Sequence, residues 1–185
     1  MLTARFDDAL VYASTLHRTQ RRKGAAIPYF SHLMAVAALV LEEGGDEDQA
    51  IAGLLHDAVE DQGGEPTFRE IRARYGDGVA QIVADCTDAW GEPKPPWRER
   101  KEAYIAHLPS AHRRSLLVSL ADKTHNAQSI RRDYEGIGDA LWDRFKGGKA
   151  GTLWYYGTLS RLFDELTPGR LATELRRTVA AFPAA

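Results

Sequence analysis

The sequence predicts an all-α fold, a helical bundle of about eight to ten helices. Apolar residues recur at intervals of three and four along most of the chain, and no stretch of useful length alternates apolar and polar residues as a strand does. Glycine pairs and prolines separate these apolar stretches, as they do at helix ends. Because 185 residues with 44% hydrophobic content suffice for one core, we expect a single domain over residues 1–185.

Three helices are expected in the first third of the chain, over about 4–19, 31–43 and 46–62. Each is preceded or opened by a residue type that accepts N–H bonds at helix starts: Thr3, Ser31 and Asp46. Glycine pairs follow the second and third helices. Between the first two helices, the segment 18–23 holds four basic residues and is predicted to be an exposed cationic loop.

The rest of the chain is expected to add six helices and one long loop. The helices span about 67–75, 78–86, 97–108, 111–130, 149–166 and 168–182. Thr67 and Glu70 have the spacing of a capping box, and Pro168 suits the first turn of the last helix. The loop 88–97 contains three prolines and a glycine, and is a candidate to cover a pocket.

Composition excludes several classes of protein. With 24 basic and 26 acidic residues the net charge is −2, which gives no global field to attract nucleic acid or anionic lipid. No apolar run approaches the ~20 residues of a membrane span, and the N-terminus lacks the apolar core of a signal peptide, so we expect a cytoplasmic protein. Cys86 is the only cysteine, which excludes an internal disulfide and a multi-cysteine zinc site. A metal would have to be bound by His, Asp and Glu.

The densest chemical cluster lies at the end of the expected helix 46–62. His56, Asp57, Glu60 and Asp61 follow a run of apolar residues, and burying four titratable groups without a function would be costly. On one continuous helix the four-residue spacing would stack His56 over Glu60 and Asp57 over Asp61. His56 and Asp57 could then bind one cation, while Glu60 and Asp61 would lie a turn further on and orient water.

Two further residues could complete a metal site. His32 lies at the start of an apolar helix, and Asp122 interrupts the apolar run 116–121, with Asn126 one turn beyond on the same face. Either residue alone would fit an ordinary structural role. Together with His56 and Asp57 they offer two nitrogen and two carboxylate ligands, a set that suits Mn²⁺, Fe²⁺ or Zn²⁺.

Five blocks of sequence also carry a family resemblance: RRKG at 21–24, PYFSH at 28–32, LLHDAVED at 54–61, DKTHN at 122–126 and TLWYY at 152–156. In this order they resemble the HD-domain metal-dependent phosphohydrolases, most closely the hydrolase domain of Rel/SpoT proteins and the free-standing small alarmone hydrolases. The resemblance spans roughly residues 5–165 and implies an HD-domain helical bundle. The chain departs from many relatives at Leu33, at Thr124 and in the loop 88–97.

The resemblance assigns roles to residues in these blocks. It implies a divalent ion, usually Mn²⁺, with the ligands His32, His56, Asp57 and Asp122. It places Glu60 and Asp61 beside the attacking water, one to activate it and the other to orient it or to shuttle its proton, without deciding which does which.

For the substrate, the resemblance implies that Arg22 and Lys23 hold phosphates or stack on the base. It further implies that Asn126 contacts the ribose or a phosphate, and that Tyr156 lines the nucleotide site. Metal activation of water, with cations to absorb charge on phosphate oxygens, is what phosphoryl hydrolysis needs. His17 and His125 lie close to these motifs, as structural residues or as hydrogen-bonding supports of the site.

The expected function is that of a Mn²⁺-dependent enzyme removing the 3′-diphosphate of (p)ppGpp or a close analogue, with GDP or GTP and pyrophosphate as products. Because no synthetase or regulatory domain follows, the chain is expected to degrade alarmones and not to make them. One alternative keeps the machinery but acts on another nucleotide, such as the 2′-phosphate of NADPH. The other is a catalytically silent nucleotide-binding regulator, which would have no chemical need for the full set of ligands and acidic residues. The oligomeric state stays open.

Overall fold

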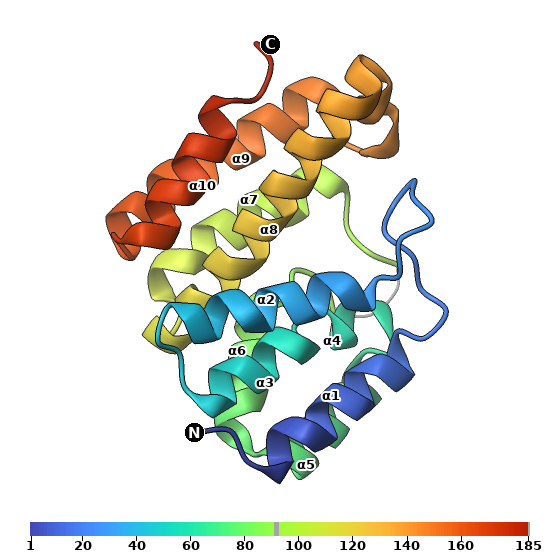
Figure 1. Ribbon diagram of the computed structural model, residues 1–185, viewed down its shortest axis with the longest axis vertical. Coiled ribbons are helices and arrows are strands. Elements are labelled where there is room, and N and C mark those ends of the chain that lie inside the picture. The colour runs from blue at the N-terminus through green and yellow to red at the C-terminus, as the bar shows by residue number, and fades with distance from the viewer. Residues whose placement is uncertain (91–92, 185) are drawn as a thin grey trace.

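The computed structural model describes residues 1–90 and 93–184 and is built almost entirely of helices (Figure 1). Within those ranges no strand is formed, and an isolated antiparallel bridge joins Arg21 and Pro28. The all-α prediction is therefore confirmed. The helices are α1 (Ala4–Leu16), α2 (Phe30–Glu42), α3 (Glu47–Leu55), α4 (Ala58–Asp61), α5 (Glu65–Tyr75), α6 (Asp77–Cys86), α7 (Trp97–His107), η1 (Leu108–Ser110), α8 (Arg113–Ile137), η2 (Gly138–Arg144), α9 (Gly148–Leu166) and α10 (Arg170–Ala180).

Helix α8 is the central element of the bundle. It packs against α2, α3 and α6 on one side and against α9 and α10 on the other, so it joins the lower and upper parts of the molecule in Figure 1. Its buried face includes Val118, Leu120 and Ala121, which lie in the same apolar core as Leu54 of α3 and Leu159 of α9. Burial of such side chains contributes about 25 cal/mol per Å² of apolar surface, and here it also fixes Asp122 at the middle of the bundle. Among the described residues, no helix combines the length and the apolar character that a bilayer span requires.

The cationic loop between α1 and α2 folds back on itself. The amide of Arg22 donates to the carbonyl of Ile27 at 2.8 Å, and the amide of Tyr29 donates to the carbonyl of Gln20 at 2.9 Å. At its tip, Gly24 has a φ of +69°, and a Cβ there would lie 2.5 Å from the side chain of Arg144. A side chain at this position would therefore clash, and the glycine allows the loop to pack against η2.

The predicted continuous helix over 46–62 is wrong. Helix α3 ends at Leu55, a turn follows at His56 and Asp57, and α4 is a separate turn of helix. The Nδ1 atom of His56 lies 2.9 Å from the carbonyl oxygen of Gly53, so this side chain bonds to the last turn of its own helix. Side chains that bond locally to the backbone compete with helix propagation. The stacking of His56 over Glu60 is consequently replaced by a different set of partners, given below.

Two predicted helix starts also differ. Helix α5 begins at Glu65 after Gly64, whose φ is +63°, and the hydroxyl of Thr67 donates to the carbonyl of Gln62 at 2.8 Å. Thr67 therefore lies within the helix and does not form the predicted capping box. Ser31 likewise donates its hydroxyl to the carbonyl of Pro28 and lies inside α2.

The caps predicted at the other early helices are confirmed. Asp46 and Gln49 form a reciprocal capping box at α3, and the hydroxyl of Thr3 accepts from the amide of Arg5 at 3.2 Å. Helix α8 runs seven residues beyond the predicted end at Ile130, and the last helix starts at Arg170, after Pro168. In the predicted loop 88–97, Gly91 and Glu92 lie outside the described residues.

Candidate active site

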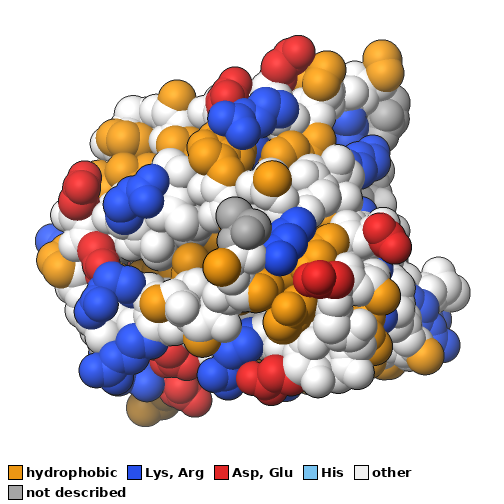
Figure 2. Space-filling model, turned by 90° about the horizontal axis from the view of Figure 1, so that it is seen from above, with side chains coloured by type: hydrophobic (Ala, Val, Ile, Leu, Met, Phe, Trp, Pro, Cys, Tyr) orange, Lys and Arg blue, Asp and Glu red, His pale blue; other side chains and the backbone are white. Residues whose placement is uncertain are grey.

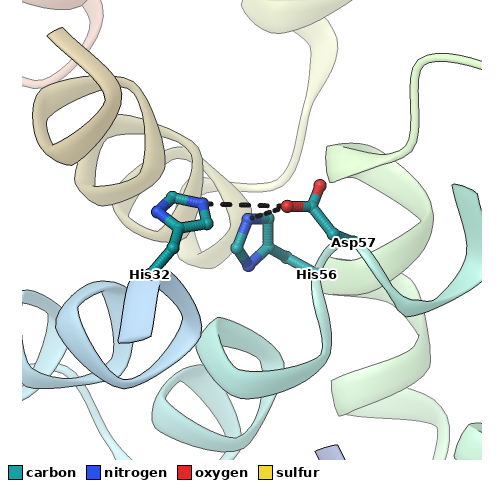
Figure 3. A group of neighbouring side chains, drawn as sticks. All are labelled: His32, His56 and Asp57. Atoms are coloured by element: carbon teal, nitrogen blue, oxygen red, sulfur yellow. Dashed lines mark ion pairs between the residues drawn. The ribbon is translucent and has the colours of Figure 1, made fainter. Parts of the chain in front are cut away.

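His32, His56 and Asp57 come together from α2 and from the turn after α3 (Figure 3). The Nε2 atom of His56 lies 2.9 Å from Oδ2 of Asp57, and Nε2 of His32 lies 3.7 Å from the same oxygen. One potential ligand atom from each residue lies within 4.8 Å of those from the other two, a separation that allows all three to bind one metal ion. Figure 3 shows both imidazole rings directed toward the carboxylate.

Asp122 of α8 faces the same group. Its Oδ1 atom lies 3.1 Å from Nε2 of His32 and 3.5 Å from Nε2 of His56. Both Nε2 atoms are buried and have no hydrogen-bond partner among residues 1–90 and 93–184. Two buried imidazole nitrogens facing two carboxylates are a donor set that a divalent cation would complete. The structure thus brings together all four ligands predicted from the sequence.

The other ring nitrogens decide how these imidazoles are oriented. Nδ1 of His56 donates to the carbonyl of Gly53, which leaves the lone pair of Nε2 for a cation. Nδ1 of His32 lies 2.8 Å from Nδ1 of His125, so one of these two rings donates and the other accepts. Burial, and after it the neighbouring His32, lowers the pKa of His125 to about 3, so His125 is neutral and able to accept. His125 is therefore a supporting partner of the site.

The carboxylates of the group are ionised. Burial alone would raise the pKa of Asp122, but Lys123 and the two imidazoles hold it well below its usual range. Asp57 behaves in the same way: burial opposes ionisation, and His56 outweighs it and lowers the pKa. For His56, burial favours the neutral ring, but Asp57 and Asp122 raise its pKa well above the ordinary value. The site therefore attracts positive charge, and protons compete with a metal ion for it.

A chain of hydrogen bonds connects Asp122 to the cationic loop. The side-chain nitrogen of Asn126 donates to Oδ1 of Asp122 at 2.5 Å, and its oxygen accepts from Arg22 at 2.6 Å. Lys123 donates to Oδ2 of Asp122 at 2.6 Å. On the other carboxylate, the hydroxyl of Tyr29 donates to Oδ2 of Asp57 at 2.5 Å. These partners hold both carboxylates in fixed orientations.

Glu60 lies in a network of charged residues that its sequence position does not predict. Its Oε1 atom lies 3.1 Å from Nζ of Lys94 and 3.4 Å from the guanidinium of Arg100. Asp88 is 5% exposed and lies 2.5 Å from both Arg100 and Lys101. Burial, together with Asp88 and Asp57, raises the pKa of Glu60 to about 7, whereas burial of Asp88 is outweighed by Lys101, which lowers its pKa to about 2.

The sequence contains the charged residues of this network, but they lie far from Glu60 along the chain. An acidic residue opens the loop 88–97 and a basic pair follows it, but nothing in their spacing relates them to Glu60, about one-fifth of the chain away. Only the path of the loop brings them together. The described part of the loop reaches the site through Lys94, which also donates to the backbone carbonyl of Glu60 at 3.1 Å.

Asp61 has a different neighbourhood. Its Oδ2 atom accepts from the side-chain nitrogen of Gln20 at 2.8 Å. Burial, and then the charge of Asp57, raises the pKa of Asp61, while Gln20 lowers it. Glu60 and Asp61 are thus adjacent in sequence but have separate polar partners, and Gln20 was not among the predicted site residues.

A cavity of about 340 Å³ adjoins the metal-ligand group. It contains all four residues predicted to bind substrate: Arg22, Lys23, Asn126 and Tyr156. Its lining also includes Lys101, Lys123, Tyr29, Trp97, Phe145 and Tyr155. Figure 2 shows Lys and Arg side chains along the right-hand edge of one face of the molecule, beside an indentation in its outline. A larger groove of about 720 Å³ lies between the start of α8 and α10 and is lined by none of the predicted site residues.

The lining of this cavity connects it to the metal-ligand group. Tyr29, Asn126 and Lys123 line the cavity and donate hydrogen bonds to the carboxylates of Asp57 and Asp122. Four basic side chains and one acidic side chain, Asp133, face the space, and aromatic rings form much of the remainder. The cavity suits an anionic molecule with a planar ring.

Comparison with known proteins agrees with this fold and site. Residues 9–151 match the HD domain model, and the chain therefore belongs to the HD-domain family. MESH1 of Xenopus tropicalis, named as a guanosine-3′,5′-bis(diphosphate) 3′-pyrophosphohydrolase, is 39% identical over 128 residues, which cover 68% of this chain and 69% of that protein. The Drosophila melanogaster protein of the same name is 33% identical over 132 residues.

A solved structure has the same fold. It is described as a metazoan ortholog of SpoT that hydrolyzes ppGpp and plays a role in starvation responses, and it superposes with a TM-score of 0.65 at 27% identity. The superposition covers 91% of this chain and 99% of that one. The resemblance to Rel/SpoT hydrolases and small alarmone hydrolases is thereby confirmed.

Proposed function

We propose that this chain is a divalent-metal-dependent hydrolase that removes the 3′-diphosphate of (p)ppGpp or a close analogue. The products are GDP or GTP and pyrophosphate. The observation that carries the proposal is the position of the four-ligand group beside a cavity with Arg22, Lys23, Lys101 and Lys123 in its walls. The named activity of the MESH1 relatives supports the choice of substrate.

His32, His56, Asp57 and Asp122 would hold the metal ion, and Mn²⁺ is the ion we propose. Their unpartnered Nε2 atoms and ionised carboxylates fit such an ion. When bound, a divalent cation supplies Lewis acidity and a lowered water pKa. Tyr29, Lys123, Asn126 and His125 orient the ligands through the hydrogen bonds given above.

Glu60 and Asp61 handle the proton of the attacking water in this proposal. A carboxyl whose pKa is about 7 can accept or release a proton near neutral pH with little cost, and Glu60 has that value. Asp61 follows Glu60 on the short helix α4 and accepts a hydrogen bond from Gln20 of the cationic loop. In this position it orients water or carries the proton onward. Water adds to the phosphorus attached to O3′, the bond from that phosphorus to O3′ breaks, and O3′ takes up a proton.

The substrate would lie in the cavity with its phosphates toward the basic residues. Arg22 and Lys23 of the loop, with Lys101 of α7 and Lys123 of α8, offset the charge of phosphate oxygens, which increases as the bond breaks. Tyr156 and Phe145 provide an apolar wall for the base or ribose. Asn126 lies between Arg22 and Asp122, where it contacts the sugar or a phosphate. A cytoplasmic location is part of the proposal.

A turnover assay on the purified protein tests the function. The protein is incubated with Mn²⁺ and either ppGpp or NADPH, and products are resolved by anion-exchange chromatography. We expect GDP and pyrophosphate from ppGpp, and loss of turnover in Glu60→Gln and Asp61→Asn with the metal content unchanged. Phosphate release from NADPH alone would support the 2′-phosphatase alternative. Binding of ppGpp without turnover would support the silent regulator, and both results would contradict the proposal.

A further inference from the structure

Gln20 lies between α1 and α2, and its side-chain amide meets three polar groups. Its Nε2 donates to Oδ2 of Asp61 at 2.8 Å, and its Oε1 lies 2.6 Å from Nδ1 of His17 and 2.6 Å from Nε2 of Gln62. An ionised carboxylate only accepts hydrogen bonds, so the nitrogen of Gln20 must face Asp61. The oxygen of Gln20 then faces the other two groups, which must both donate to it.

This arrangement fixes the proton of His17. The residue follows α1 and is 1% exposed, and burial lowers its pKa, so the ring is neutral and carries one N–H. Because Gln20 presents its oxygen, that N–H is on Nδ1. The Nε2 atom has no hydrogen-bond partner in the part of the chain that the structure describes. The hydrogen bond from Nδ1 to Gln20 is therefore the one that satisfies this buried ring.

His17 is also linked to Asp57, a candidate metal ligand, through Tyr29. Its ring stacks on Tyr29, with the centroids 5.5 Å apart and the planes 18° from parallel. The hydroxyl of Tyr29 donates to Asp57. One buried imidazole thus supports Asp61 through Gln20 and a ligand carboxylate through Tyr29.

From these contacts we propose that His17 and Gln20 are positioning residues that hold the Asp61 carboxylate in its working orientation during hydrolysis. The inference rests on the proposed function for the reaction, and on the hydrogen bonds of Gln20 for the assignment. Neither residue lines the substrate cavity. Substitutions that remove the hydrogen bonds of Gln20 but keep a ring against Tyr29 should therefore reduce kcat and leave KM and metal binding nearly unchanged.

Steady-state kinetics of four variants test whether kcat falls while KM stays unchanged. Gln20→Leu removes the donor to Asp61, and His17→Phe keeps a ring on Tyr29 but removes the Nδ1 donor. We expect both to lower kcat by about 10- to 100-fold, the cost of a small misplacement of a reacting group. His17→Asn restores an N–H near the position of Nδ1 and should recover at least part of the lost kcat. Gln81→Leu makes the same substitution on an exposed face of α6, so it should leave kcat unchanged.

The opposite pattern would overturn the proposal. A wild-type kcat in Gln20→Leu would show that Asp61 needs no such support, and equal losses in His17→Phe and His17→Asn would indicate a packing role only. A raised KM or a reduced metal content, with kcat intact, would mean that the two residues act in substrate or metal binding, and this would contradict the proposal. Thermal unfolding of each variant shows whether any loss reflects instability.

A second measurement does not depend on the substrate. Long-range ¹H–¹⁵N correlation spectra of the protein loaded with a diamagnetic divalent ion report which nitrogen of His17 carries the proton. We expect the Nδ1–H tautomer in the wild type and its loss in Gln20→Leu. An Nε2–H tautomer in the wild type would mean that Gln20 presents its nitrogen to His17, and the proposal would fail. If the wild type does not hydrolyse ppGpp, the proposed function fails while the spectra still decide the geometry.

Discussion

The Nδ1 atom of His32 lies 2.8 Å from the Nδ1 atom of His125. Since His125 is neutral at ordinary pH, it can accept the Nδ1 proton of His32 and so direct the lone pair of the opposite nitrogen toward Asp57 and Asp122. His125 thus orients His32, a candidate metal ligand, without being a candidate ligand itself.

Replacement of the acceptor should weaken metal binding. In His125→Leu, the Nδ1 proton of His32 loses its partner, and the two ring tautomers are no longer distinguished. We expect the affinity for Mn²⁺ to fall by about 10- to 100-fold, as is usual for such outer partners, measured by isothermal titration calorimetry. His107→Leu is the matched control, because that imidazole is 44% exposed and pairs with Asp85, which is not a candidate ligand. Equal affinities for His125→Leu and the wild type would contradict the assignment.

Metal removal should lower stability through the ligand group. An ion present at 100 times its Kd stabilises the folded state by about 2.7 kcal/mol. For a domain of this size that corresponds to a rise in Tm of roughly 5 to 10 °C over the chelated protein, measured by scanning calorimetry. Asp122→Asn removes a ligand charge and should abolish this rise, whereas Asp143→Asn, on the exposed surface, should retain it. A rise of the same size in both variants would show that the ion binds elsewhere.

The raised pKa of Glu60 should make stability depend on pH. In the unfolded chain the carboxyl ionises near its ordinary value of 4.5, but in the folded protein it ionises at about 7. The folded state therefore binds the proton more tightly, and wild-type stability is lost as pH rises through that interval. In metal-free protein, Glu60→Gln should be more stable than the wild type by roughly 1 to 3 kcal/mol at about pH 8, with a smaller difference at about pH 5.

Urea unfolding at the two pH values measures this difference. Glu102→Gln alters a carboxylate that is 54% exposed and should give a difference near zero at both. If Glu60→Gln were instead less stable at the higher pH, the ion pairs with Lys94 and Arg100 would dominate, and the raised pKa would be wrong.

Trp97 in the cavity wall depends on two glycines at the start of α9, Gly147 just before the helix and Gly151 in its first turn. A Cβ at Gly147 would lie 2.6 Å from the Trp97 ring, and one at Gly151 would lie 3.1 Å from it. Gly147→Ala should therefore displace the ring, destabilise the fold by about 1 to 3 kcal/mol and change KM for the substrate. Gly157→Ala lies in the same helix with nothing within 4 Å, and it should stabilise by about 0.5 to 1 kcal/mol.

Urea unfolding and steady-state kinetics of these two variants provide the check. Stabilisation by Gly147→Ala, with an unchanged KM, would mean that the Trp97 ring has room to move. A destabilised Gly157→Ala would mean that space around α9 is more restricted than the contacts indicate.

The sequence by itself determined the all-α class and the residues of the candidate metal site. Helical periodicity is a local property, so apolar spacing located most of the helices without reference to their neighbours. The polar residues His32 and Asp122 were recognisable because the first lies at the start of an apolar helix and the second interrupts an apolar run. An unneeded polar group would be costly to bury at either place. The motif blocks then related them to His56 and Asp57. The residue types and the order of the motif blocks were therefore enough to predict that these four residues share one site.

Only the tertiary structure decided the partners of the catalytic candidates. The break between α3 and α4 arises where a side chain bonds to its own helix, and periodicity contains no sign of it. Contacts such as Gln20 with Asp61, or Lys94 and Arg100 with Glu60, join residues 34 to 41 positions apart. Charged and amide side chains at such separations meet only after the loops have packed against the core. The free energy that positions these loops comes mainly from burial of apolar residues elsewhere, so the polar residues themselves do not reveal it.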